Sequence, residues 1–372
     1  MCRFASDPEA NTGAIEWDNL RRHLKTLVLI LITAVILWRL WRGLNWGEVR
    51  QSFREANVLL VALAVIASSA TNLLRAFRWR ALLSGLTEAR INEVFAAVNI
   101  GIGANFLFGG AVAELVRPLS LPLLDRRVGT AASFLTIVVE RICDLSVLSL
   151  LFGASLFWLP AIAGHRINEA EIRTAGVILM ALPLLGLLAL ATLKRDSIAG
   201  AKCFAVSGER WRMAPRRWQR GISSLARQLA GALRILSNRR GLAIVTLWTT
   251  GQWLATILAN WLIFRAFGLP FGAKETVVVM CCGLVGSFVP TPGGAAGAFH
   301  AAISSGLIFL GATLEQAAAI SITAHLAGFV PALVFGALYF LSRGVNFTQL
   351  QHELTIATEQ KVESLEKADV GC

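Results

Sequence analysis

Five charged side chains stand within or beside long apolar runs, where a charge is costly: Glu114, Arg117, Glu140, Arg141 and Asp144. A charge at the centre of a membrane helix costs about 2.5–3.5 kcal/mol on insertion scales. Glu140 and Asp144 are four residues apart and share a helix face, so they repel unless a cation such as Arg117 or Arg141 lies beside them. This pattern predicts either a polar vestibule that binds an anionic headgroup, because arginine binds phosphate bidentately, or a purely structural ion network.

A second basic group, Arg75-Ala-Phe-Arg78-Trp79-Arg80, closes the apolar run that precedes it. It is typical of a basic stop at the inner membrane surface with a tryptophan anchor. The alternative is that Arg75 and Arg78 collect anionic lipid headgroups at the mouth of the site.

Proline and glycine break a later apolar run at Pro290-Thr-Pro292-Gly293-Gly294. Proline removes a backbone donor and glycine admits positive φ, so a half-helix is expected to start near Ala295. Its free N–H groups would suit an anion, whereas a tight packing turn is the alternative. His300 and His325 follow, each as a core histidine or as a proton relay.

The composition decides the class of protein that holds these groups. Of 372 residues, 55% are hydrophobic and only 16% are charged, which excludes an ordinary soluble enzyme and a disordered chain. No nucleotide-binding loop, catalytic motif or cysteine–histidine spacing suited to zinc is present, so we predict no catalytic residue, metal or cofactor. The net charge of +12 is assigned to cytoplasmic loops and not to nucleic-acid binding, because no basic patch interleaved with aromatic residues accompanies it.

Eight apolar runs are long enough to span a bilayer, or nearly so, and helices are the expected structure. They fall at about 24–42, 57–74, 94–116, 129–160, 174–193, 242–264, 275–311 and 316–341. We therefore predict an all-α, polytopic integral membrane protein with six full spans and two broken or re-entrant hairpins, at 94–116 and 275–311.

Basic loops set the expected orientation. The segment 194–240 holds twelve Lys and Arg against two acidic residues, and it should be cytoplasmic together with the Arg21–Lys25 cluster. All clusters lie inside only if 94–116 enters and returns on the cytoplasmic side. That run is rich in Gly and Asn, and a broken hairpin is tolerated where it is buried or lines a wet cavity.

The two broken runs resemble each other. Gly103, Phe106 and Gly109-Gly110-Ala111 parallel Gly286, Phe288 and Gly293-Gly294-Ala295. One run is entered from inside and the other from outside, so an inverted-topology repeat is expected.

These features divide the chain into a leader, two membrane halves, a linker and a tail. The predicted bounds are a cytoplasmic leader at 1–23, a first half at 24–195, a basic cytoplasmic linker at 196–241 with an amphipathic helix at 221–240, a second half at 242–342 and a cytoplasmic tail at 343–372.

Four motifs together resemble the transmembrane, flippase-like region of lysylphosphatidylglycerol synthases and its stand-alone relatives. They are Arg-Ala-x-Arg-Trp-x-x-Leu-Leu at 75–83, Asn105…Gly110…Glu114-Leu-Val-Arg117, Glu140-Arg141-x-x-Asp144 and Pro-Thr-Pro-Gly-Gly at 290–294. The resemblance covers about 24–342 and implies a membrane protein that moves a lipid or a lipid-linked headgroup between leaflets. Where the family places an acidic residue shortly after Pro-Gly-Gly, this chain has His300.

The predicted function is a flippase or transporter in the cell (inner or plasma) membrane, with both termini cytoplasmic. Its substrate would be an anionic or phosphate-bearing lipid, including polyprenyl-linked ones. The expected site residues are Asn105, Gly109, Gly110, Glu114, Arg117, Glu140, Arg141 and Asp144 in the cytoplasmic half, and Pro292, Gly293, Gly294 and His300 in the outer half. The alternatives are a membrane-embedded transferase with a lipid-linked donor and a non-transporting partner of a lipid or envelope biosynthesis complex. Membrane lipids are the expected partners, with a homo-oligomer or a biosynthetic protein as further partners.

Overall fold

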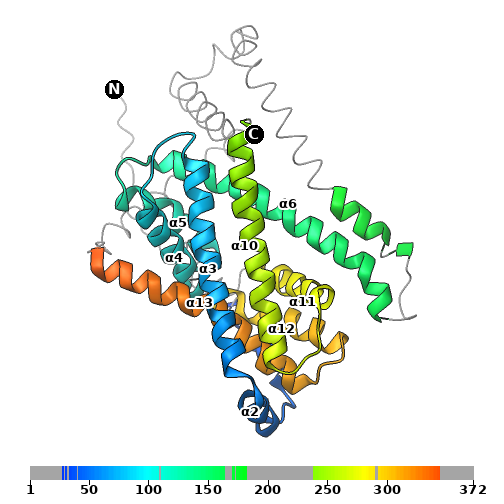
Figure 1. Cartoon of the computed structure of the whole chain (residues 1–372). Coiled ribbons are helices and arrows are strands. Elements are labelled where there is room, and N and C mark those ends of the chain that lie inside the picture. Colours follow the sequence, from blue (N-terminus) through cyan, green and yellow to red (C-terminus); the bar gives the residue numbers. More distant parts are fainter. Residues whose placement is uncertain are drawn as a thin grey trace, which may run out of the picture.

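The computed structural model describes residues 27–28, 30–31, 33–39, 41–108, 110–163, 170–171, 173–181, 238–289 and 292–343. All regular structure within these ranges is helical, as predicted. The principal helices are α2 (Trp46–Glu55), α3 (Val58–Leu83), α4 (Ile91–Phe108), α5 (Gly110–Leu124), α6 (Thr130–Ala163), α10 (Arg239–Ala266), α11 (Ala273–Gly286), α12 (Pro292–Phe309) and α13 (Leu314–Arg343) (Figure 1).

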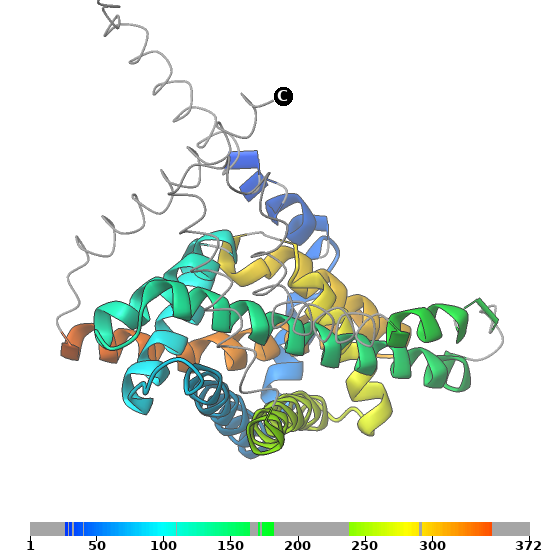
Figure 2. The same cartoon turned by 90° about the horizontal axis from the view of Figure 1, so that it is seen from above.

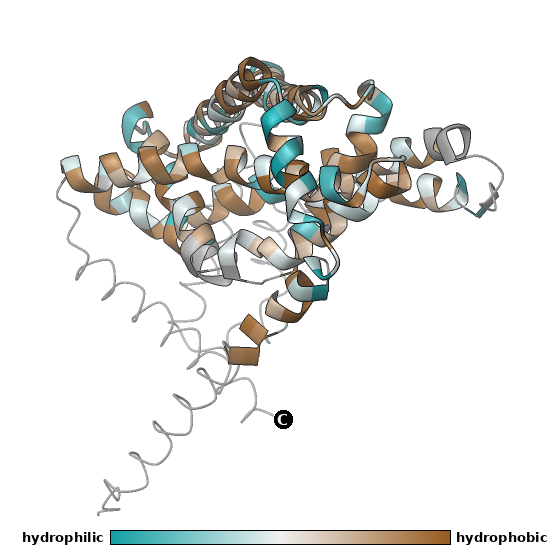
Figure 3. Cartoon of the chain, turned by 90° about the horizontal axis from the view of Figure 1, so that it is seen from below, coloured by the Kyte–Doolittle hydropathy of each residue, from teal (hydrophilic) through white to brown (hydrophobic). Residues whose placement is uncertain are grey.

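Three helices, α3, α10 and α13, are long and apolar enough to cross a membrane. They coincide with the runs predicted at 57–74, 242–264 and 316–341. Many of their exposed residues are large and apolar, and on α13 these recur as Leu326, Val330, Val334 and Leu338. A stripe at this spacing lies on one face of a helix, where lipid can cover it. Figure 3 shows the same predominance of apolar residues along the helices. The helices are therefore those of a membrane protein.

The other predicted spans are helical wherever they are described. The run at 129–160 forms the 34-residue helix α6, and the described parts of 24–42 and 174–193 are almost entirely helical. The total of six spans stays a prediction. Most of the linker, including 221–237 of the expected amphipathic helix, lies outside the described residues, as do the leader and the tail beyond 343.

Helices α3 and α10 pack side by side in opposite directions. The backbone N–H of Asn57 donates to the carbonyl of Ala266 over 2.9 Å, and further along Phe77 stacks on Trp248 with ring centroids 4.9 Å apart. Viewed from above, this pair is nearly end-on, while α6 and α13 run across it (Figure 2). The pair forms one wall against which the hairpins and α6 pack.

The run predicted as a re-entrant hairpin at 94–116 folds as two antiparallel helices, α4 and α5. Helix α4 ends at Phe108 and α5 begins at Gly110, and Gly101 lies against Arg117. A Cβ at Gly101 would come within 2.7 Å of the Arg117 Cβ, so the close approach requires glycine here. The break thus falls at the Gly-Gly pair, and the hairpin extends from 91 to 124.

The second broken run also folds as a helical hairpin, α11 and α12. Gly283 contacts Ile303, and Gly286 contacts Ala298, so the two helices run antiparallel. At the start of α12, Gly293, Gly294 and Ala295 have φ of 74°, 65° and 64°. These left-handed residues break the helix where the Pro-Gly-Gly sequence predicted it. An inverted relation between the two hairpins stays a prediction.

Candidate functional site

A buried ion network joins α3, α5 and α6. Arg78 donates from its two terminal nitrogens to Asp144, over 2.6 and 2.9 Å, and its Nη2 lies 3.0 Å from Glu140 Oε1. Arg117 donates in the same bidentate way to Glu140, over 2.7 and 2.8 Å. The side chains of Arg78 and Glu140 are fully buried. Glu140 and Asp144 therefore share a helix face, as expected, with guanidinium groups from two other helices beside them.

Arg141 contributes less to this network. Its Nη2 lies 3.9 Å from Glu140 Oε1, and its side chain is 43% exposed. Asp144 pairs instead with Arg78, a residue that the sequence assigned to collecting headgroups. Arg78 thus acts inside the protein as a structural partner of both carboxylates.

Trp79 belongs to the same cluster and has no contact with the surface. It is completely buried, and its indole N–H donates to the Thr136 hydroxyl over 3.0 Å. The Arg117 guanidinium lies 4.3 Å from the centre of its ring, which is a cation–π contact. The interpretation of Trp79 as a membrane anchor is therefore wrong, because the ring is completely buried and packs against Arg117.

A cavity of about 350 Å³ lies directly beside the network. Arg75, Arg117, Arg141 and Asp144 are among its lining residues, and Asn105 on α4 also reaches it. The volume is at the lower end of the roughly 300–1,000 Å³ typical of ligand sites, so it fits a headgroup and not whole acyl chains.

Arg75 is the distinctive group in this cavity. It lies one turn before Arg78 on α3, but no described residue forms an ion pair with it, and its buried Nε has no hydrogen-bond partner. Four arginines and two carboxylates meet here, so the described cluster carries two positive charges in excess. The cavity therefore contains a cation, Arg75, that is not paired with any described carboxylate. An anion in the cavity could bind to it.

The rest of the described lining is neutral, and part of it is apolar. Gln252 and Trp253 of α10 and Ser287 at the end of α11 supply polar atoms. Leu145 and Phe288, which also line the cavity, are 49% and 61% exposed. The charged side of the cavity is thus continuous with an apolar surface of the kind that contacts lipid chains.

The predicted outer half of the site does not line this cavity. His300 is buried, its Nδ1 lies 3.1 Å from the Ser321 hydroxyl, and its ring stacks on His325 at 4.9 Å. His325 Nε2 lies 3.0 Å from the carbonyl oxygen of Gly293, and Phe329 covers Gly294. The structure therefore places Gly293, Gly294 and His300 in a separate buried aromatic cluster that holds the start of α12.

Four other predicted residues can be placed only in part or not at all. Gly109 lies outside the described residues, Gly110 and Glu114 are assigned only to helix α5, and Pro292 begins α12. The sequence analysis did not select Gln252 or Trp253. In the sequence they are only two side chains with polar atoms in the middle of the apolar run 242–264. They become candidates for the site only when the structure shows that they line the same cavity as Arg75.

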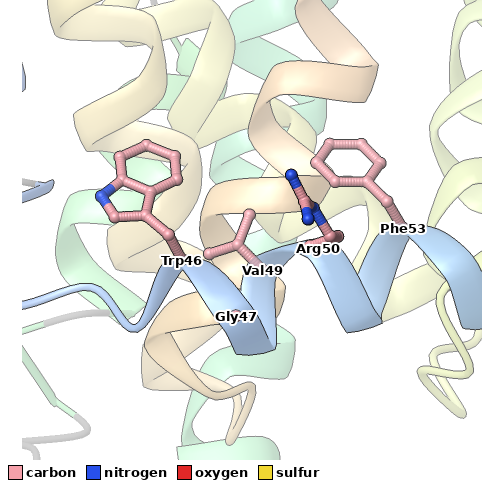
Figure 4. A pocket seen from close by; sticks show the side chains of 5 residues that line it. All are labelled: Trp46, Gly47, Val49, Arg50 and Phe53. Atoms are coloured by element: carbon pink, nitrogen blue, oxygen red, sulfur yellow. The ribbon is translucent and has the colours of Figure 1, made fainter.

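A second hollow, of about 550 Å³, runs along α2 and is lined by Trp46, Gly47, Val49, Arg50 and Phe53 (Figure 4). It has one cation and no described carboxylate or hydroxyl. It lies at the start of α3, far along that helix from Arg75, and we assign it no chemistry.

The model of one protein family, the lysylphosphatidylglycerol synthase TM region, matches residues 26–336. The chain belongs to this family. The match includes both hairpins, the ion network and the cavity, and it confirms the resemblance seen in the four motifs. No curated protein matches the chain.

Membership of the lysylphosphatidylglycerol synthase TM region family agrees with the membrane-type helices and establishes a membrane protein of a family linked to lipid metabolism. Among the described residues, this cavity combines charged side chains, a volume of about 350 Å³ and an apolar lining.

Proposed function

We propose that this protein moves an anionic, phosphate-bearing lipid between the two leaflets of the cell membrane. The observation that carries the proposal is the cavity, in which Arg75 has no described carboxylate partner and exposed apolar residues form part of the lining. A phosphate would bind beside Arg75 and Arg141, while its acyl chains would lie against Leu145 and Phe288 in the bilayer.

Electrostatics supports this assignment. A charge inside the membrane costs about 2.5–3.5 kcal/mol, and the buried Nε of Arg75 has no hydrogen-bond partner among the described residues, which makes this guanidinium a liability to the empty protein. A phosphate oxygen would remove that penalty, because hydrogen bonds between ionised partners are roughly twice as strong as neutral ones.

The arrangement of the hairpins supports transport over simple binding. One face of the cavity comes from Gly101, Ile102 and Asn105 in α4, and another comes from Leu284, Ser287 and Phe288 at the end of α11. If the hairpins are inverted repeats that enter from opposite sides, as the sequence predicts, each could open the cavity to one leaflet. Cytoplasmic termini, which the basic loops favour, would place the Arg75 end of α3 on the inner side.

The transferase alternative receives less support. A transferase would need a carboxylate base in the cavity, and the carboxylate that lines its described part, Asp144, accepts both hydrogen bonds from Arg78. The remaining alternative is a partner without transport activity, and it predicts that the purified chain does not accelerate lipid flipping.

The test is a leaflet-translocation assay in vesicles that contain a fluorescent phospholipid with a phosphodiester headgroup. The purified full chain should accelerate flipping, and Arg75→Ala and Arg141→Ala should lower the rate by at least about tenfold. Arg54→Ala, an exposed arginine on α2, is the matched control and should transport normally. If the wild type does not exceed empty vesicles, or if both cavity variants transport normally, the proposal fails.

A further inference from the structure

The two hairpins meet α13 at a pair of titratable rings. His300 of α12 stacks on His325 of α13, with ring centroids 4.9 Å apart. Phe106, near the end of α4, lies 5.9 Å from the His325 ring and 5.4 Å from the Phe329 ring. Phe106 directly follows Asn105, which lines the cavity. The histidine pair thus lies where α4, α12 and α13 come together.

Hydrogen bonds determine which ring nitrogens carry protons. The Ser321 hydroxyl donates its one proton to the carbonyl of Ala318 over 2.9 Å, so its oxygen accepts from His300 Nδ1 at 3.1 Å. A carbonyl oxygen can only accept, so His325 Nε2 donates to Gly293 over 3.0 Å. Each neutral ring therefore uses its single N–H in one bond and keeps one unprotonated nitrogen.

The packed cluster suits neutral rings. His325 Nδ1 is buried and has no partner among the described residues, so a proton bound there would find no acceptor. In the described part of the chain, the titratable group that acts on each ring is the other histidine, and no carboxylate, lysine or arginine from α12, α13 or the helices packed against them does so. Two imidazolium rings stacked this closely would also repel each other. The cluster must therefore open to water before both rings can gain protons.

Opening would release the turn that begins α12. The bond from His325 holds Gly293, the first of three residues with positive φ, and the third of them is Ala295. A residue with a side chain keeps such a conformation only where the surrounding structure holds it. The turn comes shortly after Phe288, which lines the cavity. Loss of the His325 bond would therefore free one segment of the cavity wall.

We propose that the His300–His325 pair is a proton-sensitive switch that holds α12 against α13 and α4 when neutral and releases the start of α12 when protonated. Histidine in water gains its proton near pH 6.5, so acidification should shift the equilibrium toward the open cluster. The proposal goes beyond the proposed function, because it concerns how the hairpins are held and not what the cavity binds.

The test is hydrogen exchange of the purified full chain in lipid nanodiscs, measured by mass spectrometry at about pH 7.5 and about pH 5.5 and corrected for the intrinsic rate at each pH. For peptides within 293–304, the opening constant should rise about a hundredfold on acidification, because each exposed histidine contributes about tenfold over this range. His300→Asn and His325→Gln keep an N–H donor in the place of the bonded nitrogen but do not titrate. Each should reduce the rise to about tenfold, and the double variant should abolish it.

Two controls separate local opening from other effects. His352→Gln removes a histidine that lies beyond the described residues and should respond as the wild type does. Peptides from the middle of α10 should keep their protection at both pH values, which distinguishes release of α12 from unfolding of the whole protein. The two single variants also keep the test decisive if the double variant does not fold.

Three results would overturn the switch. They are an opening constant for 293–304 that does not change with pH in the wild type, a rise in both single variants as large as that of the wild type, and an equal loss of protection in α10. None of them depends on lipid transport, so the proposed function can stand while the switch is refuted, and the reverse also holds.

Discussion

Two arginines one helical turn apart on α3 should respond oppositely to replacement. Arg78 has both terminal nitrogens on Asp144 and one of them also close to Glu140, whereas Arg75 has no ion pair with a described residue. Methionine is a suitable replacement for each, because it keeps most of the apolar stem and removes the charge.

The expected magnitudes follow from these contacts. Arg78→Met leaves Asp144 without its bidentate partner and Glu140 with one fewer cation, and breaking a buried pair costs about 3–5 kcal/mol. Arg75→Met removes a partly buried cation that has no ion pair with a described carboxylate, so the free energy of unfolding should change by less than about 1 kcal/mol or rise. The difference between the two variants should be at least about 2 kcal/mol.

The free energy of unfolding can be measured in mixed micelles by titration with dodecyl sulfate, followed by tryptophan fluorescence. Arg78→Met/Asp144→Leu supplies a further check, because replacing a whole ion pair with apolar residues is often neutral. The double variant should be more stable than Arg78→Met alone. If Arg75→Met is as destabilising as Arg78→Met, the distinction between a structural arginine and a binding arginine is wrong.

Two more predictions concern the turns that hold the hairpins. Burial raises the pKa of Asp125, but hydrogen bonds from the backbone N–H of Arg90 and from Arg127 outweigh it and hold the pKa below its usual range. The ionised carboxylate is thus favoured by folding, so its stabilisation is present above the unfolded pKa, about 3.9, and is lost as the pH falls through the lower folded pKa. Asp125→Asn should lower the free energy of unfolding by about 1 kcal/mol at pH 7, and thermal unfolding profiles should show the gap closing below about pH 4. Gly294→Ala should cost about 1–3 kcal/mol in the same micelle titration, because φ is +65° and an added Cβ would lie 2.6 Å from the Phe329 ring; Ala295→Gly, at φ 64°, should instead be neutral or stabilising, and a stable Gly294→Ala protein would contradict the strained turn.

The sequence predicted the breaks in the helices well because their causes are local. Gly109-Gly110 and Pro292-Gly293-Gly294 change the conformational freedom of the backbone itself, so their positions do not depend on neighbouring helices. The structure places both hairpins at these residues, with bounds that differ from the predicted ones by a few to several residues at either end.

The partners of the charged residues were harder to predict because they depend on which helix faces meet. Hydropathy ended the second run at residue 74, but α3 continues to Leu83, and Arg78 thereby enters the core and pairs with Asp144. A charge near the end of an apolar run looks like a stop signal unless its carboxylate is known to lie on another helix. The position of Gln252 was equally hard to predict, because only the packing of α10 against α3 brings it to the cavity.

The ion network also has a consequence for the order in which the protein can be assembled during synthesis. Arg78 and Asp144 are separated by 66 residues, so the arginine leaves the ribosome well before the carboxylate that pairs with it. At about 5–20 residues per second, that interval is roughly 3–13 s. During it the final turns of α3 carry Arg78 with no partner, and the arginines must stay near the headgroups, where long basic side chains can reach water. Helix α3 can reach its final depth only when α6 arrives, which makes insertion of the first half a cooperative event.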